Sequence, residues 1–151
     1  MEPRGEGALA DLLCFDLYTA SRSLTGLYRT VLAELDLTYP QYLVMVELWR
    51  HRACPIKTVV TDLGLDYSTL TPLLQRLAAK GLVQRDRGDA DERSVVISLT
   101  VTGAALEERG SHVQEQVRAA MELDADAAVA LQQALRALTA SVTGWSPLAQ
   151  R

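Results

Sequence analysis

The sequence contains two cysteines, and Cys14 is the one that lies near the start of a helical pattern. A cysteine thiolate attacks peroxides and becomes a sulfenic acid, which can condense with another thiol. The positive end of the helix dipole favours a thiolate in the first turns of a helix. A lone cysteine on a helix is nevertheless more commonly a small buried apolar residue. The local sequence therefore leaves two interpretations of Cys14 open, a reactive thiol and a packing residue.

Two tyrosines follow Cys14 on the same predicted helix. Tyr18 comes four residues later, which places it on the same helix face as Cys14. Tyr28 comes fourteen residues later, close to that face again but about 21 Å further along the helix axis. Within one chain, Tyr28 therefore cannot reach the sulfur of Cys14. An antiparallel copy of the helix from a second chain would bring the two side chains together.

The helix that carries these residues is predicted over residues 8–35, where apolar residues recur every three or four positions. It is much longer than the mean helix of about 11–12 residues, and a long amphipathic helix often needs a partner on more than one side. The remaining chain predicts helices over 41–50, 57–63 and 69–80, strands over 82–87 and 93–99, and helices from 101 to about 117 and over 126–142. We expect Ser68 to cap the 69–80 helix, Pro72 to lie in its first turn and Gly81 to end it.

This order of elements predicts a mainly α fold with a small β-hairpin wing. We expect residues 55–100 to form a winged helix-turn-helix module and residues 8–35 and 101–143 to form N- and C-terminal dimerisation helices, all within a single domain, 1–151. The composition agrees, because 48% of the 151 residues are apolar and only 5% are aromatic, as expected for helices packed through Leu, Val and Ala.

Composition also limits the function. The net charge of −4 means that contact with a nucleic acid must come from a local basic patch. The sequence shows neither a signal peptide nor an apolar run long enough to cross a membrane, so we expect a cytoplasmic protein with no membrane partner. Cys14 and Cys54 have no finger-like spacing to His51 or His112, so no metal ligands, catalytic residues or cofactor are predicted. Cys54 precedes Pro55 in a predicted loop and is expected to be structural.

The 69–80 helix and the hairpin after it have the polar and basic side chains of a DNA-reading module. Over residues 67–87, four basic side chains and one carboxylate, Asp86, leave a local charge of +3. Hydroxyls, a glutamine and arginines at such positions suit base edges and phosphates, and arginines at a hairpin tip suit the minor groove. The alternative is an ordinary solvated surface. The candidates for DNA contact are Ser68, Thr69, Thr71, Gln75, Arg76, Lys80, Arg85, Arg87 and Arg93.

Two segments resemble the MarR family of transcriptional repressors. The run Asp91-Glu92-Arg93-Ser94-Val95-Val96-Ile97-Ser98-Leu99-Thr100, followed by Gly103, is similar to the wing signature of that family, and Ser68-Thr69-Leu70-Thr71-Pro72-Leu73-Leu74 is similar to its recognition helix. The resemblance covers about residues 9–138. It implies that Asp91 shapes the wing and that Arg93 reaches the minor groove of a palindromic operator in double-stranded DNA.

The N-terminal half resembles one branch of the family, the organic hydroperoxide resistance regulators. The segments that carry this likeness are Leu13-Cys14-Phe15-Asp16-Leu17-Tyr18, then Tyr28, then Leu37-Thr38-Tyr39-Pro40-Gln41-Tyr42. The resemblance implies that Cys14 senses organic hydroperoxides, that Tyr28 and Tyr39 bond its sulfur and that Tyr18 lines the pocket of a homodimer. Because no late second cysteine is present, the chain resembles the one-cysteine type, which forms a mixed disulfide with a low-molecular-weight thiol.

Two alternatives to a thiol-switched repressor remain at this point. A MarR-type repressor can be released by a small phenolic or aromatic ligand, with Cys14 only packing. A thiol peroxidase would consume the peroxide, but the sequence offers no obvious Arg or His partner near Cys14. Turnover assays separate the peroxidase from the repressors, and a Cys14→Ser variant separates the two repressors.

Overall fold

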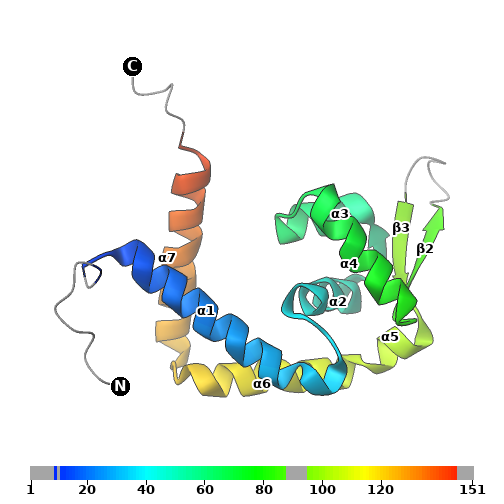
Figure 1. The fold of residues 1–151 in the computed structure, drawn as a ribbon, viewed down its shortest axis with the longest axis horizontal. Helices are drawn as coiled ribbons and strands as arrows, with labels where there is room; N and C mark the ends of the chain where they lie inside the picture. The colour runs from blue at the N-terminus through cyan, green and yellow to red at the C-terminus, as the bar shows by residue number, and fades with distance from the viewer. Residues whose placement is uncertain (1–8, 10, 88–94, 146–151) are drawn as a thin grey trace. The chain divides into compact units, whose positions relative to one another are not determined.

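The computed structural model of the chain describes residues 9, 11–87 and 95–145 (Figure 1). The chain divides into two compact units, Met1–Val117 and Arg118–Arg151. Along the chain lie the helices α1 (Leu13–Val31), η1 (Ala33–Leu35, a 3-10 turn), α2 (Tyr39–His51), α3 (Ile56–Leu63), α4 (Tyr67–Ala79), α5 (Val101–Ala105), α6 (Glu107–Met121) and α7 (Ala125–Thr143), and the strands β1 (Ala53–Pro55), β2 (Val83–Arg87) and β3 (Val95–Leu99). A mostly helical chain with a small sheet confirms the predicted fold class.

The first helix is shorter than its apolar pattern predicts. α1 begins at Leu13, because Leu12 before it is extended, with φ −93° and ψ 101°. At the other end, the 3-10 turn η1 replaces the last predicted turn of the helix. Asp36, in the left-handed region at φ 51°, ends the helical segment. Cys14 is therefore the second residue of α1 and lies in its first turn.

Helix α2 begins with a capping box that the sequence analysis did not identify. Thr38 Oγ1 accepts a hydrogen bond from the Gln41 backbone N–H at 3.4 Å, and Gln41 Oε1 accepts one from the Thr38 N–H at 3.0 Å. This pair satisfies two backbone donors and also the polar group of Gln41, which is only 2% exposed. The corner between α1 and α2 is thereby fixed in a defined turn.

Three details of α4 differ from the prediction. The cap is Asp66, which accepts from the Thr69 N–H at 2.7 Å, and Ser68 lies inside the first turn. Pro72 is the sixth helical residue and lies past the first turn, so the carbonyl of Ser68 lacks its usual helical donor. Gly81 ends the helix as predicted, with φ 68° and the Leu82 N–H bonded to the Leu77 carbonyl at 3.1 Å.

The sheet has three antiparallel strands in the order β1-β3-β2. The predicted hairpin is β2 and β3, with Arg85 opposite Ile97. The prediction missed β1, which pairs Cys54 with Ile97 on the other side of β3. A three-residue strand that contains a proline gives no alternating pattern, and the proline is tolerated because β1 is an edge strand. The loop predicted at 88–92 and the strand start at Arg93 lie outside the described residues.

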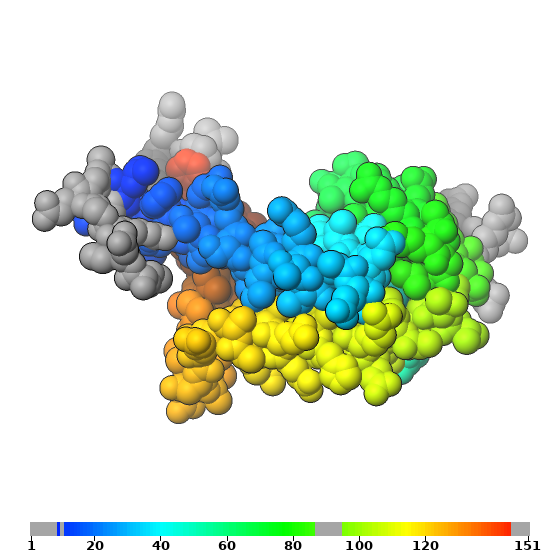
Figure 2. All heavy atoms as spheres, turned by 60° about the horizontal axis from the view of Figure 1, so that its bottom comes forward, coloured from blue at the N-terminus to red at the C-terminus, as the bar shows by residue number. Residues whose placement is uncertain are grey.

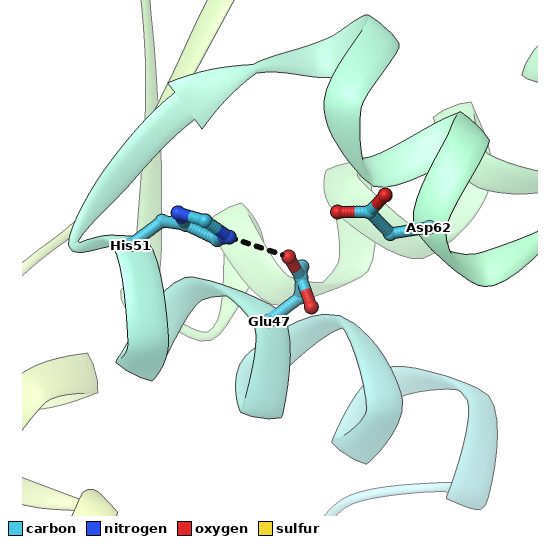
Figure 3. A group of neighbouring side chains, drawn as sticks. All are labelled: Glu47, His51 and Asp62. Atoms are coloured by element: carbon cyan, nitrogen blue, oxygen red, sulfur yellow. Dashed lines mark ion pairs between the residues drawn. The ribbon is translucent and has the colours of Figure 1, made fainter.

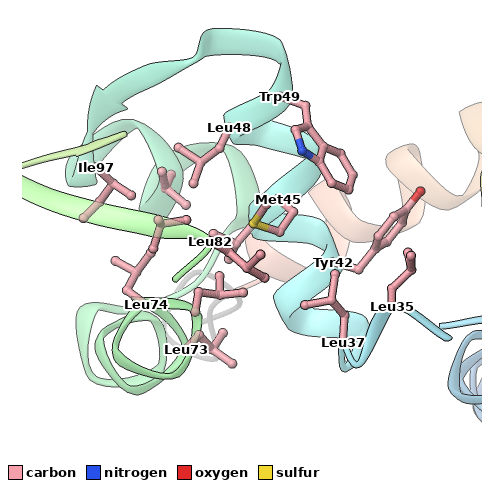
Figure 4. Close-up of a cluster of buried hydrophobic side chains, with 14 of the residues drawn as sticks. Leu35, Leu37, Tyr42, Met45, Leu48, Trp49, Leu73, Leu74, Leu82 and Ile97 are labelled. Atoms are coloured by element: carbon pink, nitrogen blue, oxygen red, sulfur yellow. The ribbon is translucent and has the colours of Figure 1, made fainter. Parts of the chain in front are cut away.

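The core of the first unit surrounds α2 (Figure 4). Tyr42, Met45 and Leu48 are at most 1% exposed and belong to one buried cluster that also includes side chains of α4 and the sheet. The apolar face of α4 is buried through Leu70, Leu73, Leu74 and Leu77. Removing side chains of this size from water stabilises a fold by roughly 1.5–3 kcal/mol each.

Two glycines let the helices after the wing approach α2 and the sheet closely. The indole N–H of Trp49 donates to the Gly103 carbonyl at 2.9 Å, and the Tyr42 hydroxyl donates to the Gly110 carbonyl at 2.9 Å. A Cβ at Gly103 would lie 1.9 Å from the backbone oxygen of Leu82, and one at Gly110 would lie 2.3 Å from the Trp49 ring. The helix predicted from residue 101 onward is accordingly two helices, which meet at Leu106.

The second unit consists of the last residues of α6 and the helix α7, which Asp124 caps by accepting from the Ala127 N–H at 2.8 Å. Its apolar residues Val129, Leu131, Leu135 and Val142 are exposed. Within the described part of the chain, no helix combines the length and the apolar character needed to span a bilayer.

Candidate functional site

One face of α4 presents the polar side chains that the sequence selected for DNA contact. Ser68, Thr69, Gln75 and Arg76 are all exposed, and the seven-residue spacings from 68 to 75 and from 69 to 76 place them on one face. Ser68 donates from its hydroxyl to Asp66 Oδ1 at 2.6 Å, which leaves its oxygen free to accept. Thr71 is half-buried and lines a hollow of about 70 Å³ between α4 and the strands.

The electrostatics of this helix start also involve a carboxylate. Hydrogen bonds from Ser68 and Thr69 hold the pKa of Asp66 below its usual value, so Asp66 stays charged and keeps the cap formed. Sequence reasoning missed Tyr67, the first residue of α4, whose side chain is 52% exposed beside Ser68. The sequence feature that could have identified it is a tyrosine directly before a short polar run. Such a combination suits a surface that contacts bases.

Lys80 is held at the other end of α4. Its ammonium group lies 2.9 Å from a carboxylate oxygen of Asp36 and also donates to the Asp36 carbonyl. The corner between α1 and α2, drawn light blue to cyan, accordingly lies beside the green α4 in Figure 2. A second basic side chain, Arg109 of α6, donates to the Glu34 carbonyl at 2.8 Å in the same corner.

The wing candidates divide into described and undescribed residues. Arg85 is exposed on β2, and Arg87 is the last residue of that strand. Asp91 and Arg93, the pair that the family resemblance assigns to the wing, lie outside the described residues. The structure therefore places the base of the wing next to α4, since α4 packs on β2.

Cys14 and Tyr18 share an exposed face of α1. Cys14 is exposed, and the Tyr18 side chain is 58% exposed one turn further along the helix. The guanidinium of Arg22 lies 5.5 Å from the centre of the Tyr18 ring. The neighbouring apolar residues are also uncovered, with Leu12 48% and Leu13 65% exposed. In a single chain, this end of α1 is an open surface.

Tyr28 and Tyr39 form a separate cluster at the other end of α1. Their rings stack with centres 4.0 Å apart and join the last turn of α1 to the first residue of α2. Tyr42 lies next to them, with its ring centre 5.9 Å from that of Tyr28. Burial raises the pKa of both Tyr28 and Tyr39, and it raises the pKa of Tyr42 to about 12, so these hydroxyls remain protonated donors. One chain brings Tyr28 and Tyr39 together but does not bring them to Cys14.

The second thiol is in a different environment. Cys54 is 5% exposed, and burial raises its pKa, with further contributions from the negative charges of Glu47 and Asp62. A thiol that remains protonated is a poor nucleophile. Of the two cysteines, Cys14 is therefore the one accessible to an oxidant.

The fold and the polar face of α4 define a winged-helix regulator, and comparisons with known proteins specify the family. The family model described as transcriptional regulator SarA/Rot matches residues 26–115. The organic hydroperoxide resistance transcriptional regulator of Bacillus subtilis is 48% identical over 101 residues, which cover 67% of this chain and 69% of that protein. The regulator MgrA of Staphylococcus aureus is 38% identical over 119 residues, 78% of this chain and 81% of MgrA.

Among solved structures, the overoxidized AbfR bound to DNA is 31% identical and superposes with a TM-score of 0.73, covering 89% of this chain and 94% of that one. AbfR comes from Staphylococcus epidermidis. The chain therefore belongs to the MarR family of transcriptional regulators, as its wing and recognition-helix motifs predicted.

Proposed function

We propose that this regulator is a homodimeric repressor that senses organic hydroperoxides through Cys14 and then releases a palindromic operator. The observation that carries the proposal is the exposed Cys14 in the first turn of α1, one turn before Tyr18. The 48% identity over 101 residues to the organic hydroperoxide resistance regulator of Bacillus subtilis supports it. The buried Cys54 does not offer such a site.

The chemistry is a two-electron oxidation of sulfur. The Cys14 thiolate attacks one peroxide oxygen, the O–O bond breaks, and the organic product leaves as an alcohol after taking up a proton. The sulfur becomes a sulfenic acid, which condenses with a small cellular thiol to a mixed disulfide and releases water. Exposed apolar side chains such as Leu13 favour an organic peroxide over hydrogen peroxide.

A second copy of the chain completes the site in this proposal. Tyr28 lies fourteen residues from Cys14 on α1, about 21 Å along the axis, and an antiparallel α1 from the second chain would bring the Tyr28–Tyr39 pair to the thiol. The exposed apolar residues of α1 and α7 support a dimer, because burying them removes apolar area worth roughly 25 cal/mol per Å². Two-fold symmetry would set the α4 helices about 34 Å apart on DNA. An operator on the bacterial chromosome would place the action of this repressor in the cytoplasm.

The test is operator binding by the full chain before and after one equivalent of cumene hydroperoxide with a low-molecular-weight thiol. Wild type should release the operator, and Cys14→Ser should bind it equally tightly and stay bound; Cys54→Ser is the matched control and should still respond. Release from oxidised Cys14→Ser would show that Cys14 is not the sensor. Repeated consumption of peroxide would instead indicate a peroxidase.

A further inference from the structure

Three side chains of types that can bind a metal ion meet where α2 approaches α3. Glu47 and His51 are one turn apart on α2, and Asp62 approaches them from α3 (Figure 3). One imidazole nitrogen and two carboxylate oxygens lie within 4.8 Å of one another. This group could not be predicted from spacing, because Asp62 comes from a separate helix and no cysteine motif marks it.

The mostly buried carboxylate of Glu47 has His51 as its ion-pair partner but accepts no hydrogen bond at Oε1 from the described residues. Its side chain is 12% exposed, and its Oε1 atom is buried. His51 Nε2 lies 2.8 Å away, which is an ion pair only while the imidazole is protonated. A buried anionic oxygen in this state is costly unless a cation compensates it.

The geometry is close to that of an ion site. Ligand atoms bound at about 2.0–2.2 Å to one ion lie roughly 3 Å or slightly more from each other. The 2.8 Å between His51 Nε2 and Glu47 Oε1 is near that separation, and Asp62 is exposed, so its side chain is free to turn inward. One nitrogen with two carboxylates suits first-row divalent ions such as Zn²⁺ or Co²⁺, whereas Mg²⁺ and Ca²⁺ prefer oxygen ligands alone.

We propose that Glu47, His51 and Asp62 bind one first-row divalent cation per chain. The ion would compensate the two carboxylates and would join the C-terminal end of α2 to α3, the helix that precedes α4 in the winged-helix module. The negative charges of Glu47 and Asp62 also raise the pKa of the buried Cys54.

The experiment titrates the reduced, full-length Cys14→Ser protein with CoCl2, followed by the visible absorption of bound Co²⁺, and then displaces Co²⁺ with ZnCl2. The Cys14→Ser background removes the exposed thiol as a competing ligand. We expect one Co²⁺ per chain, no comparable binding of Mg²⁺, and a rise in the unfolding temperature with Zn²⁺ concentration. Asp62→Asn and His51→Ala should each weaken Co²⁺ binding by roughly tenfold or more.

His112→Ala is the matched control, because His112 is the other histidine of the chain and is exposed on α6. Asp62→Asn alters an exposed side chain and keeps its shape, so its folding is not at risk. The proposal is wrong if the protein binds no Co²⁺ at millimolar concentration. It is also wrong if His51→Ala and His112→Ala bind Co²⁺ equally well.

Discussion

Replacing Gly103 by alanine should destabilise the protein although alanine is the better helix former. The added Cβ would lie 1.9 Å from the Leu82 oxygen and 3.2 Å from a Leu99 methyl group. The oxygen belongs to the backbone, so no rotamer change relieves the clash, and α5 must move away from the start of β2. That movement loosens the hydrogen bond from the Thr100 N–H to the Leu82 oxygen, 3.1 Å long, and the bond from Trp49 to residue 103.

The expected loss follows from three contributions. Overpacking costs about 1–3 kcal/mol, and a weakened hydrogen bond costs about 0.5–1.5 kcal/mol. The helix propensity of alanine returns about 1 kcal/mol. The net loss of roughly 2 kcal/mol should lower the urea midpoint by about 1 M at an unchanged m-value, given m of about 1–3 kcal/mol/M.

Gly26→Ala is the internal control for this prediction. A Cβ at Gly26 has no neighbour within 4 Å in its own chain, and the residue lies inside α1, so the same substitution should lower the midpoint far less than Gly103→Ala does. Both variants are compared with wild type at one protein concentration, since a dimer unfolds in a concentration-dependent way. A Gly103→Ala midpoint equal to that of wild type would refute the reasoning about close approach.

Three further predictions concern the wing, the sensor and the recognition-helix cap. Arg93→Ala should weaken operator binding by about 1–3 kcal/mol, as for a specific groove contact; unchanged affinity and salt dependence would remove the wing from the interface. Tyr28→Phe should slow the oxidation of Cys14 with little effect on operator affinity in the reduced state, measured by thiol titration against peroxide; unchanged reactivity, or a monomer in sedimentation at micromolar concentration, would defeat the cross-chain site. The pKa of Asp66 is lower in the folded chain, so its contribution to stability is complete above about pH 4 and is lost as the pH falls through the folded value. Asp66→Asn, which caps without titrating, should therefore lose less stability than wild type between pH 5 and pH 2 in thermal unfolding; parallel curves would show that the cap does not titrate.

Local signals predicted the fold well where they act within a few residues. Gly81 ends α4 in the left-handed conformation, as its position after the helical pattern indicated, and Gly64 ends α3 in the same way. The predicted start of α1 is wrong. Leu9 and Leu13 fit a helical period, but the extended Leu12 between them interrupts the helix. The cap of α4 was assigned two residues late, since Asp66 and Ser68 are both good caps by type.

The candidate site could be predicted only in part, because its contacts join distant segments. The exposed polar face of α4 follows from helical spacing, and so does the pairing of Cys14 with Tyr18. The stacking of Tyr28 on Tyr39 depends on the turn at the corner between α1 and α2, and no periodic pattern encodes that turn. The cluster around Glu47 likewise needs α3 to fold back against α2.

Operator binding should depend on salt less steeply than the basic residues of the module would suggest. Each phosphate contact releases condensed counterions and steepens the dependence of log K on log salt by about 0.9. Lys80 is paired with Asp36, 44 residues away in the chain, so part of its charge is offset before DNA binds. A phosphate contact by Lys80 should therefore release fewer counterions than a contact by an unpaired lysine. Asp36→Asn would release that ammonium group, so the same regulator would become more strongly attracted to any duplex and less able to distinguish its operator from the rest of the chromosome.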